Sequence, residues 1–229
     1  MTANVQSSVL VIDIGGNNVK VLGPRRHEVI KIPSGKTMTA NKMVKKVRQA
    51  LGTTKVSTIS IGYPGPVIAG RPVSEPHNLA QGWVGFDFEK AFGRPVKVIN
   101  DAALQALGSY DGGRMLFLGL GTGLGSTLII DGIIAPLELA HLPYKRGRTY
   151  EDYVGLRGLL RLGKKKWRQH VLRVVKQLRA AMQADYVVLG GGNARLMHKL
   201  PRSVRLGQNS DAFLGGCRLW QERAQSASG

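Results

Sequence analysis

The chain has 229 residues, of which 43% are hydrophobic, and its 33 lysines and arginines outnumber its 14 aspartates and glutamates, a formal net charge of +19. This length fits one large domain or two small ones, and so positive a chain attracts polyanions such as nucleic acid, inorganic polyphosphate or an anionic membrane surface. A single cysteine, Cys217, excludes an intrachain disulfide framework and a clustered thiolate zinc site, and we expect it to be a small buried apolar residue.

The start of the chain shows no targeting signal. Its first eight residues, MTANVQSS, have neither a positive start nor an apolar core, so no secretory signal is expected. No apolar run reaches the roughly 20 residues of a membrane helix. We therefore predict a cytoplasmic protein without a membrane segment.

The first half of the chain alternates short apolar runs, typical of strands, with helical patterns. Apolar runs on both sides of a Gly/Asn turn predict a hairpin of residues 9–14 and 19–22. The further elements are a helix at 40–51, a strand at 59–62, a helix near 87–92, a strand at 96–99 and a helix at 102–108.

The second half begins with another strand, glycine turn and strand, at residues 115–120, 121–125 and 126–130. This weak internal repeat suggests two lobes of related build. Later elements are a long amphipathic helix with Trp167 and Met182 on its apolar face, a strand at 186–189, a helix from Asn193 and a helix at 212–222.

Two glycine turns suit phosphate binding, because glycine lets backbone N–H groups approach phosphate oxygens. The first follows Asp13, whose carboxylate at a strand end could hold a divalent cation or merely cap a hairpin. The second turn, 121–125, is not a dinucleotide fingerprint, since its spacing is G-x-G-x-G and a strand follows it. Its hydroxyls at Thr122 and Ser126 could also contact phosphate.

Two pairs of polar residues are further candidates. Asn100 and Asp101 stand where a strand gives way to a helix, so Asp101 could accept a proton from a hydroxyl, although such a pair more often caps the helix. Glu138 and His141 could grip neighbouring sugar hydroxyls or form a loop ion pair. A zinc site that uses His141 is not expected, because further ligands are missing nearby.

Seven stretches, taken in order, resemble the ROK family of repressors, open reading frames and sugar kinases, and within it the polyphosphate glucokinases. They are DIGGNNVK at 13–20, IGYPGPV at 61–67, NLAQGW at 78–83, VINDA at 98–102, LGTGLGS at 120–126, LELAH at 137–141 and VVLGGGNA at 187–194. Seven ordered blocks over most of the chain are far more specific than any one of them.

The resemblance implies an α/β fold of the two-lobed actin-like ATPase (ribonuclease H-like) class, with mixed sheets flanked by helices and the active site between the lobes. The N-terminal lobe would span residues 1–107, completed by the C-terminal helix at 212–229, and the C-terminal lobe would span 108–211. A homodimer is usual among such relatives.

The resemblance also implies a glucokinase-like phosphotransferase with an alcohol acceptor, which uses Mg²⁺ and moves a phosphoryl group from polyphosphate or ATP to a hexose. Asp101 would be the general base. The sugar would be bound by Gly65, Asn78, Asn100, Asp101, Glu138, His141 and, as a further glutamate, Glu151. The donor phosphates would be held by Asp13, Gly15, Gly16, Asn17, Asn18, Lys20, Gly121, Thr122, Gly123, Gly125, Gly190, Gly191 and Gly192, and Asp13 would also hold Mg²⁺, directly or through water.

Three departures from the family pattern stand out. Asn17 replaces a threonine after the glycine pair, and Ala140 replaces the glycine of a Glu-x-Gly-His motif. The cysteine-rich zinc loop of many relatives is missing, as it is in polyphosphate glucokinases, so no structural zinc is expected. The segment 144–166 matches no family block.

Two other classes of function stay open. A catalytically weak sugar sensor is conceivable because the family includes repressors, but only eight residues precede the first strand, where repressors carry a helix-turn-helix. A nucleic-acid-binding module would explain the basic clusters at 42–48, 145–148 and 164–168 but not the ordered glycine and carboxylate blocks, and solvated surfaces explain those clusters equally well. The expected partners are therefore a hexose and a polyanionic phosphate donor, without membrane or nucleic acid.

Overall fold

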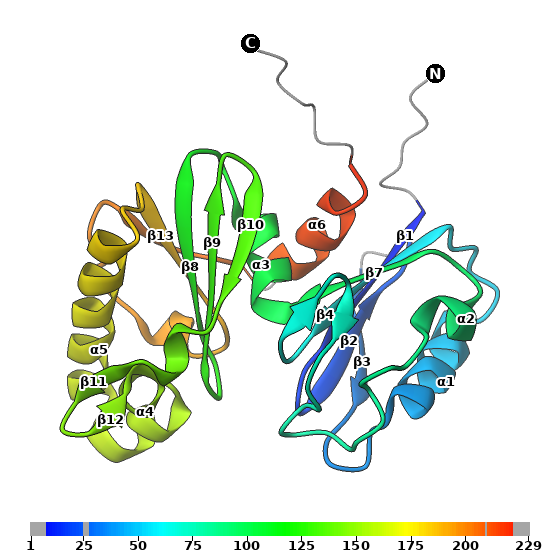
Figure 1. The fold of residues 1–229 in the computed structure, drawn as a ribbon, viewed down its shortest axis with the longest axis horizontal. Coiled ribbons are helices and arrows are strands. Elements are labelled where there is room, and N and C mark those ends of the chain that lie inside the picture. The colour runs from blue at the N-terminus through cyan, green and yellow to red at the C-terminus, as the bar shows by residue number, and fades with distance from the viewer. Residues whose placement is uncertain (1–7, 25–27, 209, 222–229) are drawn as a thin grey trace, which may run out of the picture. The chain divides into compact units, whose positions relative to one another are not determined.

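The computed structural model describes residues 8–24, 28–208 and 210–221, and the chain folds as two compact units (Figure 1). Unit 1 comprises Met1–Leu104 and Ala212–Gly229, and unit 2 comprises Gln105–Asp211. Each unit is built on a five-stranded mixed sheet with helices packed against it. Within the described ranges, no helix combines the length and the apolar composition needed to cross a bilayer.

The sheet of unit 1 has the strand order β3-β2-β1-β4-β7. Its strands are β1 (Val9–Ile14), β2 (Asn18–Leu22), β3 (Ile30–Pro33), β4 (Thr58–Tyr63) and β7 (Val96–Asn100). The first three pair antiparallel, whereas β1, β4 and β7 pair parallel. Parallel pairing places the carboxyl ends of β1, β4 and β7 at one edge of the sheet.

The helices of unit 1 follow the apolar periodicity of the sequence. In α1 (Ala40–Leu51) the buried side chains lie on one face, and the Thr39 side chain caps its first turn by accepting from Lys42 N. The remaining elements are the hairpin β5 (Val67–Ile68) and β6 (Arg71–Pro72), α2 (Phe88–Phe92), the first turn of α3 (Asp101–Ser109), which continues into unit 2, and α6 (Asp211–Arg218), whose first residue belongs to unit 2.

The sheet of unit 2 repeats the pattern of unit 1, in the order β10-β9-β8-β13-β14. Its strands are β8 (Arg114–Leu120), β9 (Leu124–Ile130), β10 (Ile133–Leu137), β13 (Tyr186–Gly190) and β14 (Val204–Leu206). Three antiparallel strands are again followed by parallel pairs. The related build that the internal repeat suggested is therefore confirmed.

A long helix and a small subdomain complete unit 2. The helix α5 (Leu156–Ala181) buries Trp167, Val171 and Leu178, as its sequence pattern predicts, and is kinked at Gly163, where φ is 72°. At the N-terminal end of α5 lie β11 (Pro143–Lys145), β12 (Arg148–Thr149) and α4 (Tyr150–Val154) (Figure 1). Among these, the Thr149 side chain and Asp152 form a capping box.

Several sequence-based expectations are wrong in detail. The strand expected at 126–130 begins at Leu124, so the second glycine turn is shorter than predicted. The helix expected from Asn193 is only a 3₁₀ turn, Ala194–Leu196, because Asn193 N donates to Leu120 O and Lys199 takes a positive φ of 55°. The last helix ends at Arg218, and its predicted end at Glu222 lies outside the described residues.

The helix α6 is held to the sheet of unit 1 through Ser60. The Ser60 hydroxyl is buried, donates to Gly216 O at 2.6 Å and accepts from the Trp220 indole at 2.9 Å. Cys217, on the same helix, is half-buried rather than buried as expected, and burial raises the pKa of its thiol.

Replacing Ser60 by alanine should lower the free energy of unfolding by about 1–3 kcal/mol, because two buried polar groups lose their partner. Chemical denaturation followed by fluorescence measures this change. The exposed Ser57 of the same unit offers the matched control, and Ser57→Ala should change the free energy by less than about 0.5 kcal/mol. Equal effects of the two substitutions would contradict this role of Ser60.

Candidate functional site

Two aspartates lie beside one glycine at the carboxyl edge of the parallel strands in unit 1. Asp13 of β1 is paired in register with Gly62 of β4, which in turn pairs with Ile99 of β7. Asp101 follows β7 as the first residue of α3. A Cβ atom on Gly62 would lie 3.4 Å from Asp101 Cα and 3.5 Å from Asp13 Oδ1. Gly62 therefore lies in contact distance of both acids, and a side chain there would overlap with Leu104 Cδ2, which a Cβ atom would approach to 2.8 Å.

Electrostatics distinguish the two carboxyl groups. Burial raises the pKa of Asp101 to about 7, and the neighbouring charge of Asp13 contributes to this rise. Asp13 is only 5% exposed and forms an ion pair with Lys20, its cross-strand partner on β2, at 3.1 Å. The backbone N–H of Ala102 and the charge of Lys20 act in the opposite direction on the pKa of Asp101. A carboxyl group that titrates near neutrality can take up and release a proton at physiological pH.

Asn100 holds the start of α3 in place. Its Oδ1 accepts from Ala102 N at 3.0 Å and from Ala103 N at 3.2 Å, which is a helix cap. Its Nδ2 donates to Gly65 O at 3.0 Å. Asn100 thereby fixes both Asp101 and the turn after β4.

The first glycine turn joins β1 to β2 and is tied to the rest of unit 1. Gly15 N donates to Asn18 O at 3.0 Å, and the Ser34 hydroxyl donates to Gly15 O at 2.7 Å. A Cβ atom on Gly16 would lie 3.0 Å from Cβ of Asn78. The predicted sugar ligand Asn78 thus lies against the turn, while the Asn17 side chain is exposed.

The second glycine turn, between β8 and β9, is held by hydrogen bonds from two sides. Gly121 O accepts from Asn193 Nδ2 at 3.0 Å. Leu124 N donates to Glu151 Oε2 at 3.1 Å. Thr122 O accepts from Leu156 N, the first residue of α5, at 3.1 Å. The turn is therefore shaped by the loop after β13 and by the start of α5.

The Glu138–His141 segment forms a short 3₁₀ turn, Leu139–His141, with both polar side chains exposed. Ser126 positions it, because its hydroxyl donates to Leu137 O at 2.8 Å and accepts from Leu139 N at 3.2 Å. Ser126 is 2% exposed and engaged in this way, so the expectation that it contacts phosphate is wrong.

The sequence model of the ROK family matches residues 10–136, more than half of the chain. The chain belongs to the ROK family.

Curated relatives of this ROK protein carry the name polyphosphate glucokinase. The protein from Mycobacterium leprae (strain TN) is 25% identical over 93% of this chain and 70% of its own. The protein from Mycobacterium tuberculosis (strain H37Rv) is 26% identical over 86% of this chain and 82% of its own. The enzyme class predicted from the sequence, a phosphotransferase with an alcohol acceptor, is the class of these named relatives.

Solved structures share the fold of this ROK protein. The inorganic polyphosphate/ATP-glucomannokinase of Arthrobacter sp. strain KM superposes with a TM-score of 0.78 at 23% identity, over 93% of this chain and 98% of its own. A ROK family glucokinase from Streptomyces griseus, in complex with glucose and AMPPNP, has a TM-score of 0.68 at 17% identity, over 92% and 98% of the chains. The predicted actin-like α/β fold class is thereby confirmed.

The predicted site residues of this ROK protein fall into two groups, one in each unit. Unit 1 holds Asp13, Gly15, Gly16, Asn17, Asn18, Lys20, Gly65, Asn78, Asn100 and Asp101. Unit 2 holds Gly121, Thr122, Gly123, Gly125, Glu138, His141, Glu151, Gly190, Gly191 and Gly192. Glu151 was predicted as a sugar ligand, and its carboxylate lies at the second glycine turn, where it also pairs with Arg157 at 3.4 Å.

Sequence reasoning missed three residues that shape the two groups: Ser34, Gly62 and Asn193. Gly62 and Asn193 lie inside family-like blocks, so the blocks signalled them without assigning a role. Ser34 lies outside every block, and its bond to Gly15 arises only from the pairing of β2 with β3.

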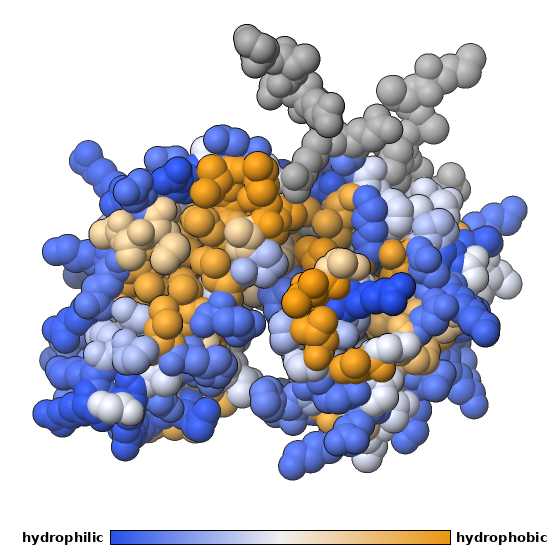
Figure 2. All heavy atoms as spheres, in the orientation of Figure 1, coloured by the Kyte–Doolittle hydropathy of each residue, from blue (hydrophilic) through white to orange (hydrophobic). Residues whose placement is uncertain are grey.

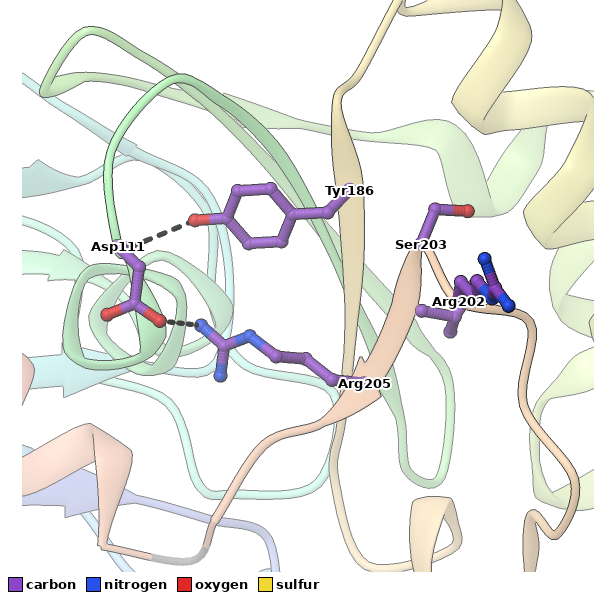
Figure 3. Close-up of a pocket in the computed structure, with 6 residues that line it drawn as sticks. Asp111, Tyr186, Arg202, Ser203 and Arg205 are labelled. Carbon is purple, nitrogen blue, oxygen red and sulfur yellow. Dashed lines mark hydrogen bonds and ion pairs between the residues drawn. The ribbon is translucent and has the colours of Figure 1, made fainter.

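A pocket of about 230 Å³ in unit 2 lies apart from all of the predicted site residues (Figure 3). Arg205 closes one side of it by pairing with Asp111 at 2.7 Å and lying over the ring of Tyr186. None of the residues that line this pocket belongs to the predicted site, and its one acid, Asp111, is already paired with Arg205.

Proposed function

We propose that this ROK protein is a hexose kinase, which transfers a phosphoryl group from polyphosphate or ATP to a hydroxyl of glucose or a similar hexose. The observation that carries the proposal is the Asp101 carboxyl group, capped in place at the end of β7, with a pKa raised to about 7. The names of the curated relatives supply the substrate class and the donor.

Asp101 is the proposed general base. A sugar hydroxyl is a weak nucleophile, and a carboxylate within hydrogen-bond reach accepts its proton as the new O–P bond forms. The oxygen between phosphorus and the donor's remaining phosphates leaves with the electron pair of the broken P–O bond. The elevated pKa of Asp101 makes its carboxylate a stronger base than an exposed aspartate.

Asp13 is the proposed ligand of Mg²⁺, directly or through water. Among the described residues, no three His, Cys, Asp or Glu side chains gather as a metal site. Mg²⁺ in kinase sites commonly takes only one or two carboxylates, completed by waters and substrate phosphates, so the single carboxylate of Asp13 beside a glycine turn fits. When bound, the ion would neutralise charge on the donor phosphates, and Lys20 would share that role.

The groups of unit 2 complete the proposed assignment. The backbone of the second glycine turn would hold donor phosphate, because its shape is fixed by Asn193 and Glu151. Glu138 and His141 would bind sugar hydroxyls, since both side chains are exposed and Ser126 fixes the backbone between them. Ala140 lies within this turn and is buried, so its methyl group need not crowd a sugar.

A coupled assay that detects sugar phosphate tests the proposal. Glucose with Mg²⁺ and either polyphosphate or ATP should give product, and omission of the sugar or the donor should abolish it. Saturable glucose binding, measured by calorimetry, without turnover from either donor would favour a sugar sensor instead. Neither binding nor turnover with any hexose would overturn the proposal.

The pH dependence of the reaction should report Asp101. Since the base must be deprotonated, kcat/KM should rise as the pH passes through about 7 and level off above it. The charge of Asp13 raises the pKa of Asp101 and that of Lys20 lowers it, so Asp13→Asn should move the rise to lower pH and Lys20→Met to higher pH. The two pH profiles are compared after normalisation to their plateaus. If both substitutions shifted the rise in kcat/KM in the same direction, Asp101 would not be the base.

A further inference from the structure

The positive charge of unit 2 is concentrated in one segment. Unit 2 contains 17 lysines and arginines and seven aspartates and glutamates, a surplus of ten positive charges. Residues 143–179 alone contain 12 of these cations and only two acids, which accounts for the entire surplus. The helix α5 carries nine cations and no acid. The rest of unit 2 is therefore electrically balanced.

These cations form one surface over the hairpin β11–β12 and α5. Burial lowers the pKa of His170, and the charges of Arg173 and Arg161 of α5 and Lys145 of the hairpin lower it further, so all three cations lie near the same ring. Figure 2 shows hydrophilic residues over β11, β12 and α4. We call the exposed lysines and arginines of residues 145–148 and 157–173 the basic face.

The two acids near the basic face are already engaged. Asp152 accepts from the backbone and hydroxyl of Thr149 in the capping box. Glu151 accepts from Leu124 N and pairs with Arg157. The three lysines 164–166 have no ion-pair partner among the described residues. Apart from the Glu151–Arg157 pair, no ion pair among the described residues neutralises a cation of the face.

Lys164, Lys165 and Lys166 are also placed unfavourably for stability. The left-handed backbone of Gly163 interrupts α5, so these lysines begin a new helical segment. The N-terminal end of a helix carries partial positive charge, which disfavours cations and favours anions. An anionic ligand on this face would relieve that repulsion as well as the repulsion among the lysines.

The basic face leads away from the second glycine turn. Leu156, the first residue of α5, donates its N–H to Thr122 O of that turn at 3.1 Å. Beyond the kink at Gly163 the uninterrupted helix of residues 164–181 is about 27 Å long at 1.5 Å per residue. A ligand that starts at the turn and follows α5 must be a long chain, far longer than the phosphates of one nucleotide.

The aromatic residues beneath the face are not free to stack on nucleic-acid bases. Tyr144 packs on Tyr150 at 5.1 Å and on Tyr153 at 5.0 Å, and its hydroxyl bonds to His170 Nδ1 at 2.9 Å. Proteins that bind single strands without sequence preference usually combine basic grooves with exposed aromatic platforms. The basic face offers charge alone, which suits a polymer of phosphate without bases.

We propose that the basic face binds an inorganic polyphosphate chain whose end reaches the second glycine turn. Only the transfer of the terminal phosphate at the glycine turn rests on the proposed kinase function. Binding of the chain to the basic face does not require turnover. It assigns to residues of α5 a selection for long chains over tripolyphosphate and ATP.

The test compares two triple variants that remove the same charge. Lys164, Lys165 and Lys166 are changed to glutamine in one, and the exposed Lys42, Lys45 and Lys46 of α1 in the other. Fluorescence anisotropy of labelled long-chain polyphosphate, without sugar, should show binding weakened on the order of 100-fold for the α5 variant only, the effect expected for three lysines near an anionic surface. Its affinity should also depend less on salt. Equal weakening in both variants would overturn the proposal, since net charge alone would explain it.

Kinetics and competition separate this inference from the kinase proposal. In the α5 variant the KM for long polyphosphate should rise, while the KM for ATP, tripolyphosphate and glucose stays the same. Unchanged KM values for every donor, with turnover intact, would refute polyphosphate binding at the basic face but not the kinase function. If the protein showed no turnover but the α5 variant selectively lost polyphosphate binding, the binding proposal would be supported and the kinase function refuted. Single-stranded DNA that displaces the chain at equal phosphate concentration would overturn the assignment to polyphosphate.

Discussion

Replacing Asp101 by asparagine is expected to lower kcat by a factor of about 10²–10⁴, the usual contribution of a positioned general base. The amide cannot accept the sugar proton, but it keeps the shape of the side chain and its Oδ1 can still accept from Ala102 N. Sugar binding should therefore persist with a dissociation constant near that of the unchanged protein. Steady-state kinetics and calorimetry with glucose measure the two quantities separately.

The matched control for this substitution is Asp87→Asn. Asp87 is an exposed aspartate of the same unit that caps α2 by accepting from Lys90 N, and asparagine caps a helix equally well. Its kcat should stay within a factor of about 2. If the Asp101 variant kept full turnover, another group would be the base and the proposed mechanism would be wrong.

The same substitution has a consequence for stability, with a definite sign. The pKa of Asp101 is about 7 in the folded protein against an ordinary value of 3.8, so the folded state binds this proton more tightly. The stabilisation is complete below pH 3.8 and is lost as the pH rises through 7, by about 4 kcal/mol at most, at 1.36 kcal/mol for each pKa unit. Asp101→Asn should therefore raise the free energy of unfolding at pH 8 but hardly change it at pH 4.

Most of the fold could be predicted because the sequence patterns are local and strong. The lysines of α1 alternate with Met43, Val44 and Val47 at helical spacing, and that helix forms within the predicted bounds. The hairpin β11–β12 and α4 could not be predicted, because each is only two to five residues long. They are held by an aromatic cluster around Tyr144 whose members are up to 26 residues apart, and periodicity cannot reveal such contacts.

The candidate site could likewise be predicted only in part. The glycine turns and Asp101 could be named from the sequence, because strand ends and small residues leave a local signal. Their surroundings could not: the rise in the pKa of Asp101 depends on Asp13, 88 positions earlier in the chain. Residues distant in the sequence also decide at which glycines a side chain would clash and at which it would meet no neighbour. Gly190 faces the ring of Phe117, whereas Gly192 meets nothing within 4 Å.

The three glycines 190–192 make this difference measurable. Gly191→Ala should lower the free energy of unfolding by about 2–4 kcal/mol, the sum of a left-handed residue and a steric overlap. Gly191 has φ of 79°, and a Cβ atom there would lie 2.7 Å from the backbone carbonyl of Leu120, which cannot move without distorting β8. Thermal or chemical unfolding of the variant measures the loss.

Gly192→Ala is the control, because Gly192 is exposed and a Cβ atom there would have no neighbour within 4 Å. It should cost less than about 0.5 kcal/mol. The Gly191 variant should also impair catalysis, since Asn193, two residues on, holds Gly121 O of the second glycine turn at 3.0 Å. If Gly192→Ala alone raised the KM for the phosphate donor, Gly192 would be the glycine of this loop that the donor approaches, and Gly191 would be required for the fold. Equal losses of stability in the two variants would contradict this division.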